Sequence, residues 1–271
     1  MSRLKTSPGS RARPPSVEGA PALRVQGLRK AFAGRVVLDG FDLAVFPGEV
    51  VALLGANGSG KSTALRCVVG LLEADAGEIV VQGKSLAGLR GTALADARKY
   101  LAMVFQQIHL VRRRSALNNV CAGALGRLTM AQSWATFTFP RDLREEAMAH
   151  LDRVGMADRA HDQVGRLSGG QQQRVAIARG LCQGASVILA DEPVSALDPA
   201  AAEQVMALMT EIAKADGLAV AAVLHQPELA RRHANRIVGL RNGRVEFSGP
   251  TASISLEQIH GLYAAPVQAA S

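Results

Sequence analysis

The sequence GANGSGKS at residues 55–62 decides the fold, because it matches the phosphate-binding pattern G-x-x-x-x-G-K-[ST]. A short apolar run at 50–54 precedes it, and a helical pattern extends from Lys61 to Leu72. The glycines let backbone N–H groups surround a phosphate, and the helix N-terminus adds positive potential. We therefore predict a strand, a phosphate loop and a helix, with Lys61 contacting the phosphates and Ser62 binding Mg²⁺.

Two acidic residues, Asp191 and Glu192, end another apolar run at 186–190. Ligands of open α/β sheets bind at the carboxyl ends of the strands, so we predict that Asp191 holds Mg²⁺ through water. Glu192 is predicted to point to the opposite face of the strand and to act as the general base for the attacking water. Taken alone, the pair could equally cap the next helix.

The remaining pattern predicts an α/β fold. Apolar runs of the buried type alternate with helical patterns, which indicates a parallel sheet covered on both faces; these runs are 50–54, 186–190 and 219–224. Other short runs predict a more exposed β subdomain; they are 23–26, 41–45 and 78–82. Asn242-Gly243 predicts a hairpin within 236–245. A helical region is predicted between Gln106 and Leu167, with 142–153 as its clearest amphipathic stretch.

Composition excludes several classes of protein. The 271 residues are 48% hydrophobic and 20% charged, which is ordinary for a soluble globular protein. Three widely spaced cysteines exclude a disulfide scaffold and a cysteine-based zinc site. No apolar run reaches the roughly 18 residues of a spanning helix, so we expect a cytosolic chain that does not cross a membrane. The net charge of +8 suits a phosphate ligand, nucleic acid or an anionic surface without choosing among them.

A second glycine-rich segment, Leu167–Gln171, directly precedes a helical pattern at 172–183. Ser-Gly-Gly at a helix N-terminus predicts a second anion site. Since one nucleotide does not need two phosphate sites from the same face of one chain, we predict a head-to-tail dimer. In that dimer, Ser168 of one copy would cap the γ-phosphate held by Lys61 of the other. The alternative is a flexible helix cap with no ligand.

These motifs together resemble the ATP-binding-cassette (ABC) ATPases, from about Leu23 to Leu240. They occur in the family order, which is the phosphate loop, Gln106, Leu167–Gln171, Asp191-Glu192, Ser195-Ala196-Leu197-Asp198 and His225. The implied fold is a P-loop NTPase core with a parallel sheet flanked by helices, an antiparallel β subdomain and a helical subdomain. Residues 1–22 are rich in Ser, Pro, Gly and Arg without a hydrophobic period, which predicts a disordered basic tail. The other expected domains are the ATPase domain at 23–250, with its helical subdomain at about 107–180, and an extension at 251–271.

The resemblance implies a role for each matching residue. Phe32 would stack on adenine, and Asp198 would communicate across the dimer. The catalytic residues would be Glu192, His225, Gln106 and Lys61, and the Mg²⁺ site would include Ser62, Gln106 and Asp191. The residues expected to bind ATP are Phe32, Gly55, Ala56, Asn57, Gly58, Ser59, Gly60, Lys61, Ser62, Thr63, Ser168, Gly169, Gly170, Gln171 and Asp198.

A narrower resemblance is to the phosphonate-importer branch of the family. It is carried by VFQQIHLVRRRSALNNVCAGALGR at 104–127, by a loop bearing Trp134, Phe137 and Phe139, by LREEAMAHLDRVGMADRA at 143–160, and by SISLEQIHGLYA at 253–264. The run Arg112–Arg114 is more basic than that branch leads us to expect. It is interpreted as a solvated charge run, or as a contact with a membrane partner or lipid headgroups.

The sequence therefore predicts the ATPase subunit of an importer, with ATP and Mg²⁺ as cofactors, peripheral on the cytoplasmic face of the cell membrane. Its expected partners are transmembrane permease subunits, a second ATPase copy and, indirectly, a solute-binding protein, with no nucleic acid. One alternative is an amino-acid, metal or export transporter, which would share every catalytic residue. Another is a non-transport ABC ATPase, although the long coiled-coil insertion, zinc motif or second cassette typical of those is missing. A kinase or GTPase would not explain Ser168-Gly169-Gly170.

Overall fold

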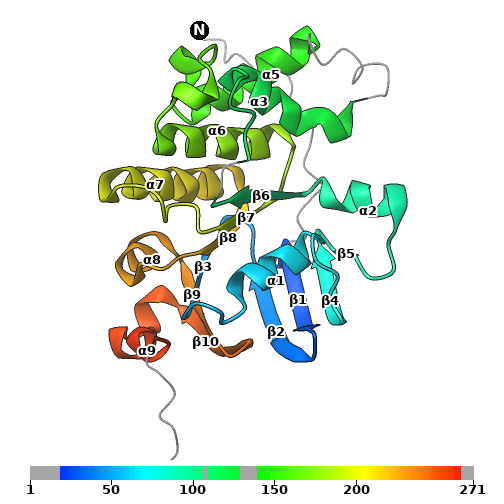
Figure 1. Cartoon of the computed structure of the whole chain (residues 1–271), viewed down its shortest axis with the longest axis vertical. Helices are drawn as coiled ribbons and strands as arrows, with labels where there is room; N and C mark the ends of the chain where they lie inside the picture. The colour runs from blue at the N-terminus through cyan, green and yellow to red at the C-terminus, as the bar shows by residue number, and fades with distance from the viewer. Residues whose placement is uncertain (1–18, 107–108, 129–138, 264–271) are drawn as a thin grey trace, which may run out of the picture.

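A computed structural model describes residues 19–106, 109–128 and 139–263 (Figure 1). The predicted tail at 1–22 therefore lies outside the described residues except for 19–22, and so do Trp134 and Phe137 of the aromatic loop. The described strands form two sheets. Their bounds are β1 Leu23–Phe32, β2 Arg35–Val45, β3 Val50–Leu54, β4 Ala76–Val81, β5 Lys84–Ser85, β6 Leu101–Phe105, β7 Val187–Asp191, β8 Ala219–Val223, β9 Arg236–Arg241 and β10 Arg244–Pro250.

The larger sheet has the strand order β10-β9-β3-β8-β7-β6 and is parallel except for β10 at one edge. Every residue of β3, β7 and β8 is buried, as expected for parallel strands covered on both faces. The smaller sheet, β2-β1-β4-β5, is antiparallel. The α/β fold and its antiparallel β subdomain, both expected from the sequence, are confirmed.

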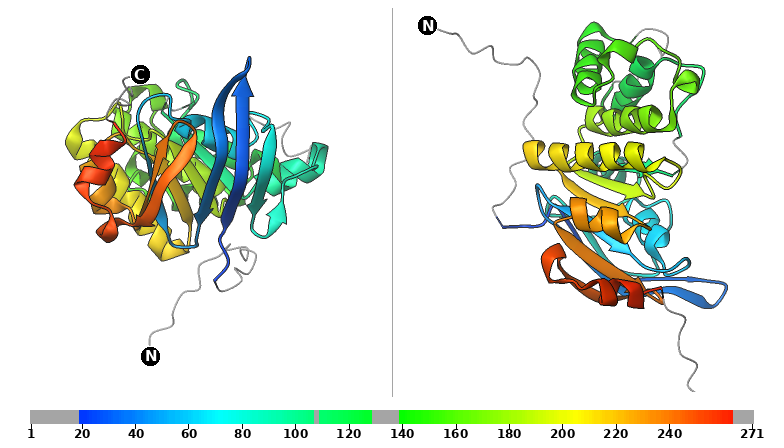
Figure 2. Two further views of the ribbon diagram at one scale, coloured as in Figure 1. Left: turned by 90° about the horizontal axis from the view of Figure 1, so that it is seen from below. Right: turned by 90° about the vertical axis from the view of Figure 1, so that its left-hand side faces the viewer.

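The described helices have the bounds α1 Lys61–Val68, α2 Gly91–Arg98, α3 Ala116–Gly123, α5 Arg141–Arg153, α6 Gly169–Cys182, α7 Pro199–Asp216, α8 Pro227–His233 and α9 Leu256–Gly261. Short 3₁₀ turns lie at Ala124–Arg127, Ala157–Arg159, Val164–Arg166 and Thr251–Ser253. Figures 1 and 2 show α6 and α7 stacked on one side of the sheet, and α1 beside the antiparallel strands on the other.

Alternate residues of each buried strand supply two separate cores, because successive side chains in a strand point to opposite faces. Val51 and Leu53 pack with α1 and the antiparallel sheet. Val50 and Ala52 pack with α6, α7 and the helices α3 and α5. The parallel sheet is therefore the rigid partition between a nucleotide-loop side and a helical side.

The ends of some elements differ from the expected ones for local reasons. The helix that begins at Lys61 ends at Val68 rather than Leu72, because Gly70 turns the chain at a φ of 69°. The hairpin predicted from Asn242-Gly243 is confirmed, and both residues have positive φ, at 50° and 79°. Within the described ranges, no helix combines the length and hydropathy that a membrane span requires.

Candidate functional site

The phosphate loop joins β3 to α1 and has a backbone that only glycine fits at its first position. Gly55 has a φ of 152°, and a Cβ placed on it would lie 2.3 Å from the carbonyl oxygen of Leu240. The loop is also held from outside, because the Gly243 N–H donates to the Ser59 carbonyl over 3.0 Å. The loop is thus shaped by its packing against β9 and the β9–β10 turn.

Lys61 opens α1 and is only 5% exposed. Its Nζ donates to the carbonyl oxygens of Gly55 and Ala56 over 2.7 and 3.0 Å. Burial lowers the pKa of the Lys61 ammonium, while the negative charges of Glu192 and Asp191 raise it. The ammonium therefore rests on neutral carbonyl groups of the loop, and an anionic phosphate offers it a stronger partner.

Ser62 and Asp191 meet although they are far apart in the sequence. The Ser62 hydroxyl donates to Oδ1 of Asp191 over 2.6 Å, and Asp191 is 4% exposed. Arg66, which the sequence analysis did not identify, places Nη2 3.6 Å from Oδ2 of the same carboxylate. The sequence could have indicated Arg66, because it follows Ser62 by four residues and such a spacing puts both side chains on one face of a helix.

Glu192 was expected to continue the strand and to point to its opposite face, but it lies outside the strand. β7 ends at Asp191, and Glu192 takes a φ of 53° in the left-handed region. Its Oε1 lies 2.7 Å from Nε2 of His225. His225 lies two residues beyond Val223, where β8 ends. The two side chains meet because both chains leave the sheet at its carboxyl edge.

Gln106 follows β6 at this same edge. Its neighbour Phe105 is paired with Asp191 in the parallel register, so Gln106 and Glu192 leave adjacent strands at the same level. The side chain of Gln106 is exposed. The edge therefore gathers the phosphate loop, His225, Glu192 and Gln106 from four neighbouring strands in the order β3, β8, β7 and β6.

The Ser168 loop lies elsewhere. Ser168 caps α6: its Oγ accepts from the Gln171 N–H, and its own N–H donates to the Gln171 side chain over 2.9 Å. Within the described residues it makes no hydrogen bond to the phosphate loop. A Cβ on Gly169 would lie 3.0 Å from Leu197, which places this loop beside the start of α7. There Asp198 caps α7 by accepting from the Ala201 N–H over 2.9 Å.

Phe32 ends β1 and is 44% exposed, with Nζ of Lys30 lying 5.4 Å from the centroid of its ring. An exposed aromatic ring is open to stacking, which is what the predicted adenine contact needs.

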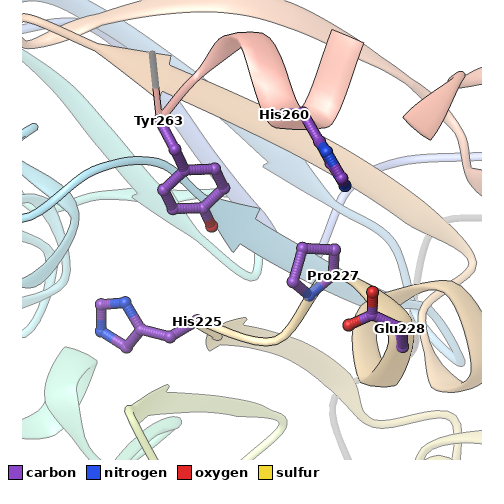
Figure 3. Close-up of a pocket in the computed structure, with 5 residues that line it drawn as sticks. All are labelled: His225, Pro227, Glu228, His260 and Tyr263. Carbon is purple, nitrogen blue, oxygen red and sulfur yellow. The ribbon is translucent and has the colours of Figure 1, made fainter. Parts of the chain in front are cut away.

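A cavity of about 470 Å³ adjoins His225 (Figure 3). The residues that line it are His225, Pro227, Glu228, His260 and Tyr263. Two of them belong to the C-terminal segment, to which the sequence analysis gave no place in the site. No short-range pattern could have indicated this, because only the fold brings 260–263 to the sheet edge.

A strand, a glycine loop and a helix, with a lysine and a serine facing a strand-end aspartate, define a P-loop nucleoside triphosphatase. The family model described as "ABC transporter" matches residues 38–195. The phosphonates import ATP-binding protein PhnC of Frankia casuarinae is 48% identical over 237 residues, covering 88% of this chain and 93% of that protein. The hypophosphite import ATP-binding protein HtxD of Stutzerimonas stutzeri is 44% identical and covers 90% of this chain and 72% of its own length.

Solved structures agree. The structure of cbiO1 from Clostridium perfringens, part of the ABC transporter complex cbiONQ, superposes with a TM-score of 0.77 at 27% identity, covering 89% of this chain and 93% of that one. The dimeric structure of a bacterial ABC transporter cassette has a TM-score of 0.73 at 31% identity and covers 86% and 100%. The chain therefore belongs to the ABC transporter family, as an ATP-binding, ATP-hydrolysing subunit.

We expect Gly55→Ala to lower the free energy of unfolding by about 2–4 kcal/mol, because the new Cβ would both strain the backbone and meet the Leu240 carbonyl. Urea unfolding followed by circular dichroism measures this change. Gly126→Ala is the matched control, because its φ is ordinary and nothing lies within 4 Å of the added Cβ. Equal stability of the Gly55→Ala variant and the wild type would contradict the packing described here.

Proposed function

We propose that this chain energises the import of phosphonates by binding and hydrolysing ATP between two copies. The observation that carries the proposal is the assembly of Lys61, Ser62, Asp191, Glu192 and His225 at one sheet edge. The Ser168 loop, which is the other predicted phosphate-binding segment, makes no hydrogen bond to that edge among the described residues of the same chain. In the proposed dimer, the Ser168 loop of a second copy completes the phosphate site of the first.

In this proposal Lys61 leaves the Gly55 and Ala56 carbonyls to contact the β- and γ-phosphates. The backbone N–H groups of the loop and of the first turn of α1 surround the same phosphates. Phe32 stacks on the adenine. ATP thereby replaces weak internal contacts of the loop with charge-assisted hydrogen bonds, which favours the bound state.

The donors near Ser62 fit Mg²⁺. A hydroxyl and a carboxylate oxygen 2.6 Å apart are hard oxygen ligands, and Mg²⁺ takes few protein ligands and keeps several waters. Within the described residues, no group of three or more His, Cys, Asp or Glu side chains could form a separate metal site. We infer that Ser62, Asp191 and Gln106 hold Mg²⁺ with the phosphates, and the ion neutralises phosphate charge when bound.

Glu192 is the proposed general base. Its carboxylate accepts a proton from the water that attacks the γ-phosphorus, and ADP leaves with the bridging oxygen. His225, 2.7 Å from Glu192, orients that carboxylate and reaches the γ-phosphate. The Ser168 loop of the partner copy, backed by the N-terminus of α6, stabilises negative charge on the transferring group.

The proposed solute follows from relatives and not from the site, since an ATPase subunit need not touch the solute. Relatives named as phosphonate import ATP-binding proteins are 39–48% identical along about nine-tenths of this chain. One relative is named for hypophosphite import, so hypophosphite is the competing solute. We infer that the chain lies on the cytoplasmic face of the membrane, bound to permease subunits and served by a solute-binding protein.

Glu192→Gln is expected to bind ATP with unchanged affinity and to lose roughly 10²–10⁴-fold in kcat, because the amide cannot accept the proton. Equilibrium binding and steady-state phosphate release measure the two quantities. Glu203→Gln is the matched control, since Glu203 pairs with His233 and Arg232 away from the loop. Normal turnover by Glu192→Gln would remove Glu192 from the role of base.

Asn57→Cys in one copy and Ser168→Cys in another are expected to be joined by a short bifunctional maleimide when ATP is bound to the Glu192→Gln protein. The background is low, because Cys67, Cys121 and Cys182 are buried. Burial raises the pKa of Cys121 to about 11 and that of Cys182 to about 12, so both stay protonated and unreactive near neutral pH. Denaturing electrophoresis detects the product. Its absence, even in the assembled transporter, would refute the head-to-tail dimer.

The solute is tested by growth of a strain that lacks this gene. We expect growth on a phosphonate as sole phosphorus source to require the wild-type gene, while growth on inorganic phosphate does not. The Glu192→Gln gene is the matched control and should not restore growth. If hypophosphite use were lost and phosphonate use were kept, the solute assignment would be wrong, although the ATPase assignment would stand.

A further inference from the structure

The hairpin that carries Phe32 packs against the phosphate loop through its second strand. In the antiparallel pairing of β1 with β2, Lys30 lies opposite Leu38. A Cβ placed on Gly60 of the phosphate loop would lie 2.8 Å from Cδ2 of Leu38, so the loop and β2 are in close contact. Phe32 follows Lys30 by two residues at the end of β1. The exposed Phe32 ring therefore belongs to a hairpin whose other strand touches the loop that is proposed to hold the phosphates.

Asp75 directly precedes β4 and is joined to β1 by three hydrogen bonds. Its backbone N–H donates to the Arg29 carbonyl over 2.9 Å. Its Oδ2 accepts from the Ala31 N–H over 2.6 Å, and its Oδ1 accepts from Nζ of Lys30 over 2.7 Å. The pairing of β1 with β4 ends at Arg29 and Ala76. Beyond that pair, the Asp75 carboxylate holds β1 in place of the strand.

Lys30 lies between this carboxylate and an aromatic ring. Its side chain is only 15% exposed, which is low for a lysine. Its Nζ lies over the Phe32 ring, 5.4 Å from the centroid, which is within the range of a cation–π interaction. The hydrogen bond to Asp75 raises the pKa of Lys30, and the hydrogen bond from Lys30 lowers the pKa of Asp75. Both groups are therefore charged near neutral pH.

This contact orients the Phe32 ring before any ligand binds. A phenyl ring has two faces, and the Lys30 ammonium lies on one of them. Since the ring is 44% exposed, a base can stack on the other face. A side chain that already has its bound orientation loses less conformational freedom when the ligand arrives. The cation on one face of the ring thereby favours binding of a base to the opposite face.

We propose that Lys30 and Asp75 are positioning residues that orient the Phe32 ring for the adenine of ATP. Asp75 holds Lys30 at the end of β1, and the Lys30 ammonium holds the ring. Both side chains act through Phe32, so their effect on affinity depends on the presence of the ring. The proposal rests on the proposed contact between Phe32 and adenine.

The test compares MgATP binding to the full-length wild type and to Lys30→Met, which keeps an unbranched side chain and removes the charge. We expect the Kd to rise roughly two- to fivefold, the range that an exposed cation–π contact provides, with kcat at saturating ATP unchanged. Lys30→Arg should stay within about twofold of the wild type, because arginine also places a cation over the ring. A loss in Lys30→Arg as large as that in Lys30→Met would overturn the role of the charge.

Lys84→Met is the matched control and should leave the Kd unchanged. Lys84 also lies over an aromatic ring, with Nζ 6.0 Å from the centroid of Tyr100. Tyr100 directly precedes β6, so it lies at the end of that strand opposite to the proposed nucleotide site.

A double-mutant cycle with Phe32 separates positioning from a direct contact with the phosphates. In a Phe32→Ala background there is no ring to orient, so adding Lys30→Met should change the Kd less than about twofold. Asp75→Asn should weaken MgATP binding in the wild-type background and add less than that loss to Lys30→Met, because Asp75 acts through Lys30. An equal loss from Lys30→Met with and without the ring, or no loss in the wild-type background, would overturn the proposal.

Hydrogen exchange without nucleotide keeps this test separate from the proposed function. The peptide spanning 27–36 should exchange faster in Asp75→Ala than in the wild type, because the Ala31 N–H loses its carboxylate partner. A Kd that Phe32→Ala left unchanged would contradict the proposed adenine contact. In that case, equal exchange of the wild type and Asp75→Ala would still refute, separately, the attachment of β1 through Asp75.

Discussion

Parallel pairing of the buried strands is the constraint on which the site depends. Four neighbouring strands, β3, β8, β7 and β6, end at one edge, and each releases a different polar group there. A slip of one residue in the pairing of β7 would send Asp191 away from Ser62, because the side-chain period of a strand is two. The burial of every residue in β3, β7 and β8, nearly all of them apolar, opposes that slip from both faces.

Much of this arrangement could be predicted because its determinants are local. The glycine spacing before Lys61 specifies a strand, a loop and a helix, and Asn242-Gly243 specifies a hairpin with two positive φ angles. The place of Asp191 at the carboxyl edge of the sheet follows from its position at the end of an apolar run. Each of these features is set by residues within about one turn or one strand.

Three features could not be predicted because they depend on contacts between distant segments. Glu192 leaves β7 in a left-handed conformation that a side-chain alternation rule cannot anticipate. The 2.7 Å distance between the Glu192 carboxylate and the His225 ring depends on how the loops after β7 and β8 leave the sheet. Tyr263 reaches the cavity beside His225 because β9 and α8 each hold the C-terminal segment through an arginine. In each case the tertiary fold determines which polar groups meet.

The edge position of β10 also affects the solubility of the protein. An outermost strand carries unpaired backbone groups that invite another polypeptide to extend the sheet. β10 alternates exposed and half-buried positions, and its exposed ones include the charged Arg244 and Glu246. It ends at Pro250, which has no backbone N–H to offer a newcomer. Another polypeptide is thereby discouraged from extending the sheet at this margin.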